Sequence, residues 1–170
     1  MDLHEKVKGA VLFVSIKSVQ IQRNETKLVG YAATASLNQD LENEVVVKLR
    51  EALIARSHEI ANQLDDTGIY LVQVYPDVEW TPDVPFESIV AVAVSEFSTL
   101  NDGFISHTLP AGTYAKITHT GPESQIGETY DAIREADIAG DRMFDFEYWA
   151  DMGSPEQEES VIEIYLPLGD

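Results

Sequence analysis

The chain has 170 residues, 44% of them hydrophobic, and its 11 Lys and Arg side chains stand against 30 Asp and Glu, a formal net charge of −19. It has no cysteine, which excludes a disulfide framework and a zinc–thiolate site, and its negative charge argues against direct nucleic-acid binding. No apolar run reaches the roughly 18–20 residues that span a bilayer, and Ala10–Ile16 lacks the flank of a signal peptide, so we expect a cytoplasmic protein.

The first half of the chain is predicted to form strands around one long helix. Apolar runs and alternation indicate strands at Ala10–Ile16, Val19–Gln22, Leu28–Ser36, Ile69–Tyr75 and Ser88–Glu96. The helix is predicted over Asp40–Leu64, with Leu37 and Asn38 before it as hydrophobic staple and N-cap. Helical spacing aligns on one stripe Leu41, Val45, Leu49, Leu53, Ile60 and Leu64.

The second half repeats this order with a shorter helix. The helix is predicted to begin at Pro122, which suits a first helical turn, and to end near residues 138–140. Its inward face consists of Ile126, Tyr130 and Ile133. The strands are predicted at Phe104–Leu109, Gly112–Thr118, Phe144–Ala150 and Ser160–Leu166.

An internal duplication is predicted from this order and from matching letters. ESIVAVAV at 87–94 aligns with ESVIEIYL at 159–166, Tyr31-Ala32 with Tyr114-Ala115, and QVYPD at 73–77 with EYWAD at 147–151. We therefore expect a single α+β domain over residues 1–170, with one module at about 19–96, another at about 103–168, and an N-terminal extension at 1–18.

Strand alternation predicts which side chains share a face of the sheet. Phe144, Phe146 and Tyr148 are expected to pack against the helices, as are Val72, Val74, Val90, Val92, Val94, Ile162, Ile164 and Leu166. The opposite face is expected to form a groove, in which the small Ala91 and Ala93 leave room. Its side chains are predicted to be Glu147, Trp149, Glu163, Tyr165, Gln73 and Tyr75, while Asp145 and Val161 share their parity.

Carboxylates beside indole and phenol rings favour a cationic, lipophilic ligand. Ring faces attract a cation by about 0.5–2 kcal/mol per contact, and a ligand cation offsets the cost of a buried carboxylate. The alternative is a solvated outer face of an antiparallel sheet. Lys116 would neutralise one acid if it points the same way, and Trp80 either covers the groove or pins a loop to the core.

The second half resembles the GyrI-like effector-binding domain, which is also the ligand-binding half of multidrug-sensing transcription regulators. The residues that carry the resemblance are LPAGTYA at 109–115, GPE at 121–123, GETY at 127–130, FEYW at 146–149 and EIYLPL at 163–168. It implies a pseudo-twofold pair of modules with a central ligand groove, and a glutamate, here Glu147, that meets cationic aromatic ligands. The family usually has Tyr at the position of Trp149.

These observations predict a domain that binds or sequesters a small cationic or lipophilic molecule, without a cofactor, metal or membrane. No helix-turn-helix pattern occurs in the sequence, so action on transcription would need a separate protein partner. Two alternatives stay open. The acidic chain could inhibit a DNA-handling enzyme such as gyrase, or Glu147 could serve a hydrolase of reactive small molecules together with Tyr114 and Trp149. His107 and His119 are a weak metal-binding pair without a third ligand.

Overall fold

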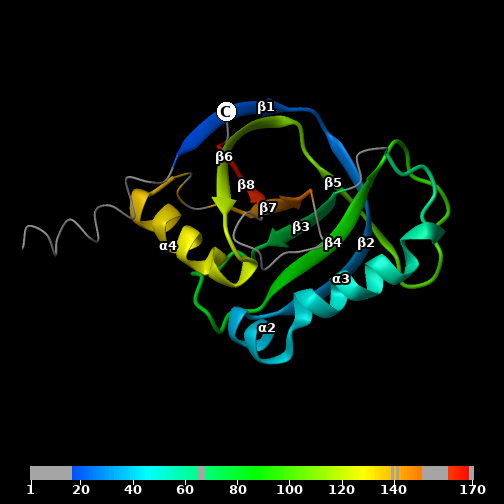
Figure 1. Ribbon diagram of the computed structural model, residues 1–170, viewed down its shortest axis with the longest axis horizontal. Helices are drawn as coiled ribbons and strands as arrows, with labels where there is room; N and C mark the ends of the chain where they lie inside the picture. Colours follow the sequence, from blue (N-terminus) through cyan, green and yellow to red (C-terminus); the bar gives the residue numbers. More distant parts are fainter. Residues whose placement is uncertain (1–16, 65–67, 139, 141, 151–160, 169–170) are drawn as a thin grey trace, which may run out of the picture.

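The computed structural model describes residues 17–64, 68–138, 140, 142–150 and 161–168. These residues form one eight-stranded antiparallel sheet with helices against one face (Figure 1). The strands are β1 (Ser18–Arg23), β2 (Thr26–Ala35), β3 (Ile69–Val74), β4 (Phe86–Val94), β5 (Ile105–Leu109), β6 (Gly112–Thr120), β7 (Phe144–Trp149) and β8 (Val161–Pro167). The α+β class and these eight strands are confirmed, whereas the predicted strand Ala10–Ile16 lies outside the described residues.

The predicted long helix is wrong, because the chain forms two helices that meet at Glu44. They are α2 (Leu37–Asn43) and α3 (Val45–Arg56), followed by the 3-10 turn η1 (Ser57–Glu59). Glu44 has a φ of 55°, a left-handed conformation that a continuing helix does not allow. The N-cap is Ser36, which forms a capping box with Gln39, rather than Asn38.

The second helix follows the prediction closely. The turn η2 (Glu123–Gln125) comes directly after Pro122 and leads into α4 (Ile126–Ala136). Ile133 is buried, and Ile126 and Tyr130 pack against the same core. Of the helices formed by the described residues, none has the length and apolar character to cross a membrane.

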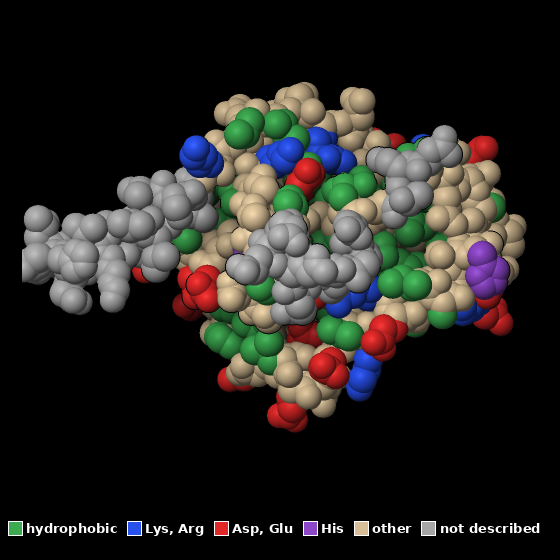
Figure 2. Space-filling model, viewed as in Figure 1, with side chains coloured by type: hydrophobic (Ala, Val, Ile, Leu, Met, Phe, Trp, Pro, Cys, Tyr) green, Lys and Arg blue, Asp and Glu red, His purple; other side chains and the backbone are tan. Residues whose placement is uncertain are grey.

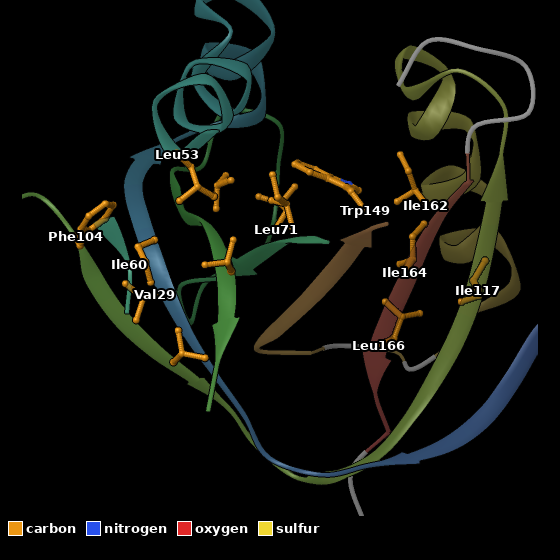
Figure 3. Close-up of a cluster of buried hydrophobic side chains, with 14 of the residues drawn as sticks. Val29, Leu53, Ile60, Leu71, Phe104, Ile117, Trp149, Ile162, Ile164 and Leu166 are labelled. Atoms are coloured by element: carbon orange, nitrogen blue, oxygen red, sulfur yellow. The ribbon is translucent and has the colours of Figure 1, made fainter. Parts of the chain in front are cut away.

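A continuous two-stranded ribbon joins the two ends of the sheet. The strand order is β1-β6-β8-β7-β3-β4-β2-β5, so β1 and β5 are the edges. Arg23 of β1 faces Gly112 of β6, and three residues further along both chains Thr26 of β2 faces Leu109 of β5. The two pairings therefore share one register, and the ribbon runs from one end of the sheet to the other (Figure 3, the blue and yellow-green strands at the bottom).

The strand order reads the same when β1–β4 are exchanged with β5–β8, which places β3 and β7 at the centre. The pairing of these two strands has the same symmetry. Val72 faces Phe146, and on either side of this pair Leu71 faces Glu147 and Gln73 faces Asp145. The predicted match of Tyr31 with Tyr114 is wrong. Tyr31 packs with the helix-side core and Tyr114 belongs to the core on the other face, so the two positions are not equivalent.

Two hydrophobic clusters cover the two faces of the sheet. The helix-side cluster unites Leu53 of α3 and Ile133 of α4 with Leu71, Trp149 and Ile164 of the central strands. Figure 3 shows Leu71 and Trp149 in the middle of this cluster, with Leu53 above and Ile162, Ile164 and Leu166 to one side. The opposite cluster fills the space between the central strands and the ribbon, with Tyr70, Val72, Phe146, Leu28, Leu109, Tyr114 and Tyr165.

The predicted faces are correct for β4 and β8 but reversed for β3 and β7. Val90, Val92, Val94, Ile162, Ile164 and Leu166 lie on the helix side as expected, and Ala91, Ala93 and Tyr165 lie opposite. Val72, Val74, Phe144, Phe146 and Tyr148, however, belong to the opposite cluster. Both faces of the central strands are buried, so hydrophobicity does not show which of them the helices cover.

Replacing Leu53 with Ala should lower the free energy of unfolding by about 2–5 kcal/mol, because its side chain is fully buried between α3 and the sheet. Leu41→Ala is the matched control, since Leu41 is 69% exposed and its loss should change stability by less than about 0.5 kcal/mol. Urea denaturation measures both. Equal losses of unfolding free energy in the two variants would contradict the break between α2 and α3.

Candidate ligand-binding site

A carboxylate is buried at the centre of the sheet, on the face that the helices cover. Glu147 of β7 faces Leu71 of β3 on one side and Ile164 of β8 on the other. Its side chain belongs to a residue only 4% exposed, and Trp149, two residues along the same face, is 2% exposed. The acid and the indole are therefore neighbours in the interior, at the seam between the two halves of the strand order.

Both oxygens of Glu147 accept hydrogen bonds from aromatic side chains. The Tyr130 hydroxyl of α4 donates to Oε2 at 2.7 Å, and Trp149 Nε1 donates to Oε1 at 2.8 Å. Burial raises the pKa of Glu147 to about 7, although these two hydrogen bonds act to lower it. The carboxyl group therefore changes its charge near neutral pH.

A second acid, Asp145, lies two residues before Glu147 on the same face of β7. Its Oδ2 accepts from the Tyr75 hydroxyl at 2.8 Å and from Arg142 Nε at 3.0 Å. Burial raises the pKa of Asp145, while Arg142 and the Tyr75 hydroxyl oppose that change. Burial also raises the pKa of Tyr75 and Tyr130 well above the usual value, so both phenols stay protonated as donors.

A cation of the chain itself lies against Trp149. Arg50 of α3 places its guanidinium carbon 4.9 Å from the centroid of the indole. The same guanidinium forms a bidentate ion pair with Glu123 of η2, at 2.7 and 3.1 Å. Arg50 is 8% exposed, so this ion pair is largely screened from water and ties α3 of the first half to η2 of the second.

The structure places the predicted site residues in two groups rather than one. Glu147, Trp149, Tyr75 and Gln73 lie together on the helix side, where Tyr75 bridges Asp145 and Gln73. Their predicted position away from the helices is therefore wrong, because the helices cover the face of β3 and β7 opposite to the one predicted.

Tyr165, Tyr114 and Glu163 lie on the opposite side of the sheet. Tyr165 stacks on Phe146, and its hydroxyl donates to Glu163 at 2.5 Å. Lys116 lies 3.6 Å from Glu163, so the acid that it neutralises is not Glu147. Arg23 of β1 covers the Tyr165 ring at 4.7 Å. The two acids predicted to share a groove are therefore separated by the sheet.

Trp80 and the two histidines lie outside the cluster around Glu147. Trp80 is 36% exposed and its ring faces Arg134 of α4 at 5.5 Å. His119 of β6 contacts the Thr129 hydroxyl at 2.7 Å and the Pro122 carbonyl at 3.0 Å, whereas His107 belongs to β5, which is not adjacent to β6 in the sheet. In the described part of the chain, no group of three or more potential ligands could hold a metal ion.

The predicted site residues do not include four members of the cluster: Asp145, which strand parity places on the face of Glu147, and Tyr130, Arg50 and Arg142. Tyr130 was expected to face inward from its helix, but nothing in the sequence pairs it with Glu147. Arg50 and Arg142 carry no sequence signal for this position.

The helices on this face expose acidic side chains, with the exposed Lys48 among them. Exposed carboxylates of α2 and α3 include Glu42 and Glu51, and Figure 2 shows Asp and Glu side chains along the lower side of the face, where Figure 1 places these helices. The formal net charge of −19 gives the protein as a whole a negative potential that attracts cations.

A family model described as Cass2, integron-associated effector binding protein, matches residues 21–168. The transcriptional regulator BrlR of Pseudomonas aeruginosa is 28% identical over 131 residues, which cover 74% of this chain and 47% of BrlR. The chain thus spans about half the length of that curated relative.

Solved structures share the fold. SAV2435 bound to tetraphenylphosphonium matches with a TM-score of 0.70 and 17% identity, over 89% of this chain and 93% of SAV2435. An integron cassette protein from Vibrio cholerae matches with a TM-score of 0.62 and 15% identity, over 89% of this chain and 96% of its own. The EcmrR–DNA complex matches with a TM-score of 0.65 and 16% identity, over 97% of this chain and 61% of EcmrR.

Glu147→Gln should stabilise the fold at pH 8.5 by up to about 3 kcal/mol relative to the native chain. The folded state binds the Glu147 proton more tightly than the unfolded state, so this contribution is present below pH 4.5 and is lost as pH rises through 7. The amide keeps one acceptor for Trp149, and the Tyr130 hydroxyl can accept from its nitrogen. Thermal melts of both proteins from pH 5.5 to 8.5 should diverge as pH rises. Parallel melting curves across that range would contradict the raised pKa.

Proposed function

Because the chain belongs to the family of Cass2 integron-associated effector-binding proteins, we propose that it binds a lipophilic organic cation through the buried carboxylate of Glu147. The resemblance to the GyrI-like effector-binding domain is thereby confirmed. The observation that carries the proposal is the 4% exposed carboxylate of Glu147, hydrogen-bonded to two aromatic side chains and lacking a basic partner among its hydrogen-bond donors in the described chain.

The charge of the ligand follows from the cost of burying Glu147. An ionised carboxylate in the interior is stabilised only by an opposite charge or by strong hydrogen bonds. Tyr130 and Trp149 supply neutral donors, so the ionised form remains costly, as the pKa of about 7 expresses. A bound cation would favour the ionised form, and this gain would add to the free energy of binding.

The lipophilic part of the ligand follows from the surroundings of Glu147. Leu71, Ile164 and the Trp149 ring belong to one apolar cluster on this face. Burial of apolar ligand surface against such side chains contributes roughly 25 cal/mol per Å². An aromatic ligand would gain further from contact with the Trp149 and Tyr130 rings. That SAV2435 was solved with tetraphenylphosphonium supports the same class of ligand for this chain.

Entry of a cation requires displacement of Arg50. The guanidinium already occupies the face of Trp149, and the Arg50–Glu123 pair spans from α3 to η2 across the site. A ligand whose cation takes this position would release the pair and allow α3 and η2 to separate. Arg50 would thus act as an internal competitor that admits only ligands with enough aromatic surface to replace it.

Tetraphenylphosphonium should bind at micromolar concentration, and Glu147→Gln should weaken it at least about tenfold, or 1.4 kcal/mol. Quenching of tryptophan fluorescence measures this in a Trp80→Phe background, which leaves Trp149 as the only indole. Tetraphenylborate has the same shape with opposite charge and should not bind. Glu163→Gln, on the opposite face, is the matched control and should change the affinity less than twofold. Equal responses to both ions would defeat the proposal.

The Arg50→Met, Glu123→Gln double variant should bind tetraphenylphosphonium about 3–10 times more tightly, since the face of Trp149 loses its internal cation. One positive and one negative charge are removed together, so the net charge of the protein is unchanged. Calorimetric titration measures the gain. Weaker or unchanged binding would show that Arg50 supports the site instead of competing for it.

A further inference from the structure

One oxygen of Asp145 is buried without a hydrogen-bond donor. Asp145 is 0% exposed, and its Oδ2 takes all the contacts: the Tyr75 hydroxyl at 2.8 Å and Arg142 at 2.9 and 3.0 Å. No donor from the described residues reaches its Oδ1. A carboxylate with three donors on one oxygen and none on the other is asymmetrically satisfied.

This arrangement costs stability. A buried acceptor without a partner lowers the free energy of unfolding by about 1–3 kcal/mol, and more when the group is charged. Arg142 supplies the compensating positive charge. Both of its contacting nitrogens approach Oδ2, so Oδ1 still has no hydrogen-bond donor. This unpaired oxygen belongs to a residue two positions before Glu147, on the same face of the same strand.

We propose that Asp145 Oδ1 accepts a hydrogen bond from the ligand, so that the site selects aromatic cations bearing N–H groups: protonated amines, amidines or guanidines. This inference rests on the proposed function and narrows its ligand class. Glu147 attracts any cation through its charge, whereas Asp145 Oδ1 adds binding free energy only for a cation that can donate a hydrogen bond. Phosphonium and quaternary ammonium ions would bind, but they would leave this oxygen unpaired.

The spacing of the two acids suits such a ligand. Residues i and i+2 of a strand lie about 6.5–7 Å apart on one face. A single nitrogen at about 2.7–2.9 Å from an oxygen of each acid spans at most about 5.8 Å, less than this backbone spacing, so a group with two nitrogens suits the pair better. An amidinium can direct one N–H toward each acid, and its aromatic substituent can then lie against Trp149. Charge-assisted hydrogen bonds of this kind each contribute more than a neutral pair.

The test compares two biphenyl cations of equal charge in the full-length chain. Biphenyl-4-carboxamidine carries N–H donors, and biphenyl-4-yl-trimethylammonium carries none. Calorimetric titration of the native protein should give a dissociation constant at least about tenfold lower for the amidine, which corresponds to 1.4 kcal/mol. Equal affinities, or tighter binding of the quaternary ion, would overturn the inference without any variant.

Asp145→Asn identifies the acceptor. Its amide oxygen can still receive Tyr75 and Arg142, which places an NH₂ group where Oδ1 was and removes the acceptor. The ratio of the two affinities should then fall to about one or below. Glu163→Gln should leave the ratio unchanged. A preference that survives in Asp145→Asn would overturn the assignment, and tetraphenylphosphonium binding shows that the variant is folded.

The inference and the proposed function fail in different ways. If neither biphenyl cation binds, and tetraphenylphosphonium does not bind either, the proposed function is wrong. If both biphenyl cations bind equally and depend on Glu147, only the role of Asp145 is wrong. The quaternary ion therefore reports on Glu147, and the ratio between the two ions reports on Asp145.

Discussion

The burial of the Glu147 carboxylate is the interaction on which this account depends. Its oxygens are held by Tyr130 and Trp149, neither of which carries a positive charge. Desolvation therefore sets its chemistry and raises its pKa to about 7. A group in this state stabilises the fold when protonated and becomes a strong attractor of cations when ionised. The same residue thus weakens the unliganded fold at alkaline pH and favours the complex with a cation.

The sheet puts this carboxylate where both halves of the chain meet. The ribbon of β1–β2 with β5–β6 joins the two ends of the sheet, and β3 and β7 pair at the centre. Each half then contributes to the surroundings of Glu147: Arg50 comes from α3 of the first half, and Tyr130 from α4 of the second. A ligand that displaces Arg50 would alter the contact between α3 and η2. Binding of a ligand at the centre of the sheet would in this way shift α3 of the first half and η2 of the second.

The strands and the pairing of Glu147 with Trp149 could be predicted from sequence, but not the face on which they lie. Residues two apart share a face whatever the tertiary structure, so this part of the prediction does not depend on where the helices pack. In β7 both sets of alternating residues are largely buried, with Phe146 in one cluster and Trp149 in the other, and alternation alone cannot assign them. Tyr130 and Arg50 reach the site from helices, whose contacts depend on packing. The break at Glu44 rests on a left-handed residue that helical spacing does not reveal.

Proton release on binding tests the central claim most directly. Calorimetric titration with tetraphenylphosphonium at pH 6.5, in two buffers of different ionisation enthalpy, counts the protons exchanged. With a pKa of about 7, Glu147 is mostly protonated at that pH, so a cation that pairs with it should release about 0.8 proton per ligand. The Glu147→Gln protein should release none. Binding of the cation to the native protein without proton release would contradict the account.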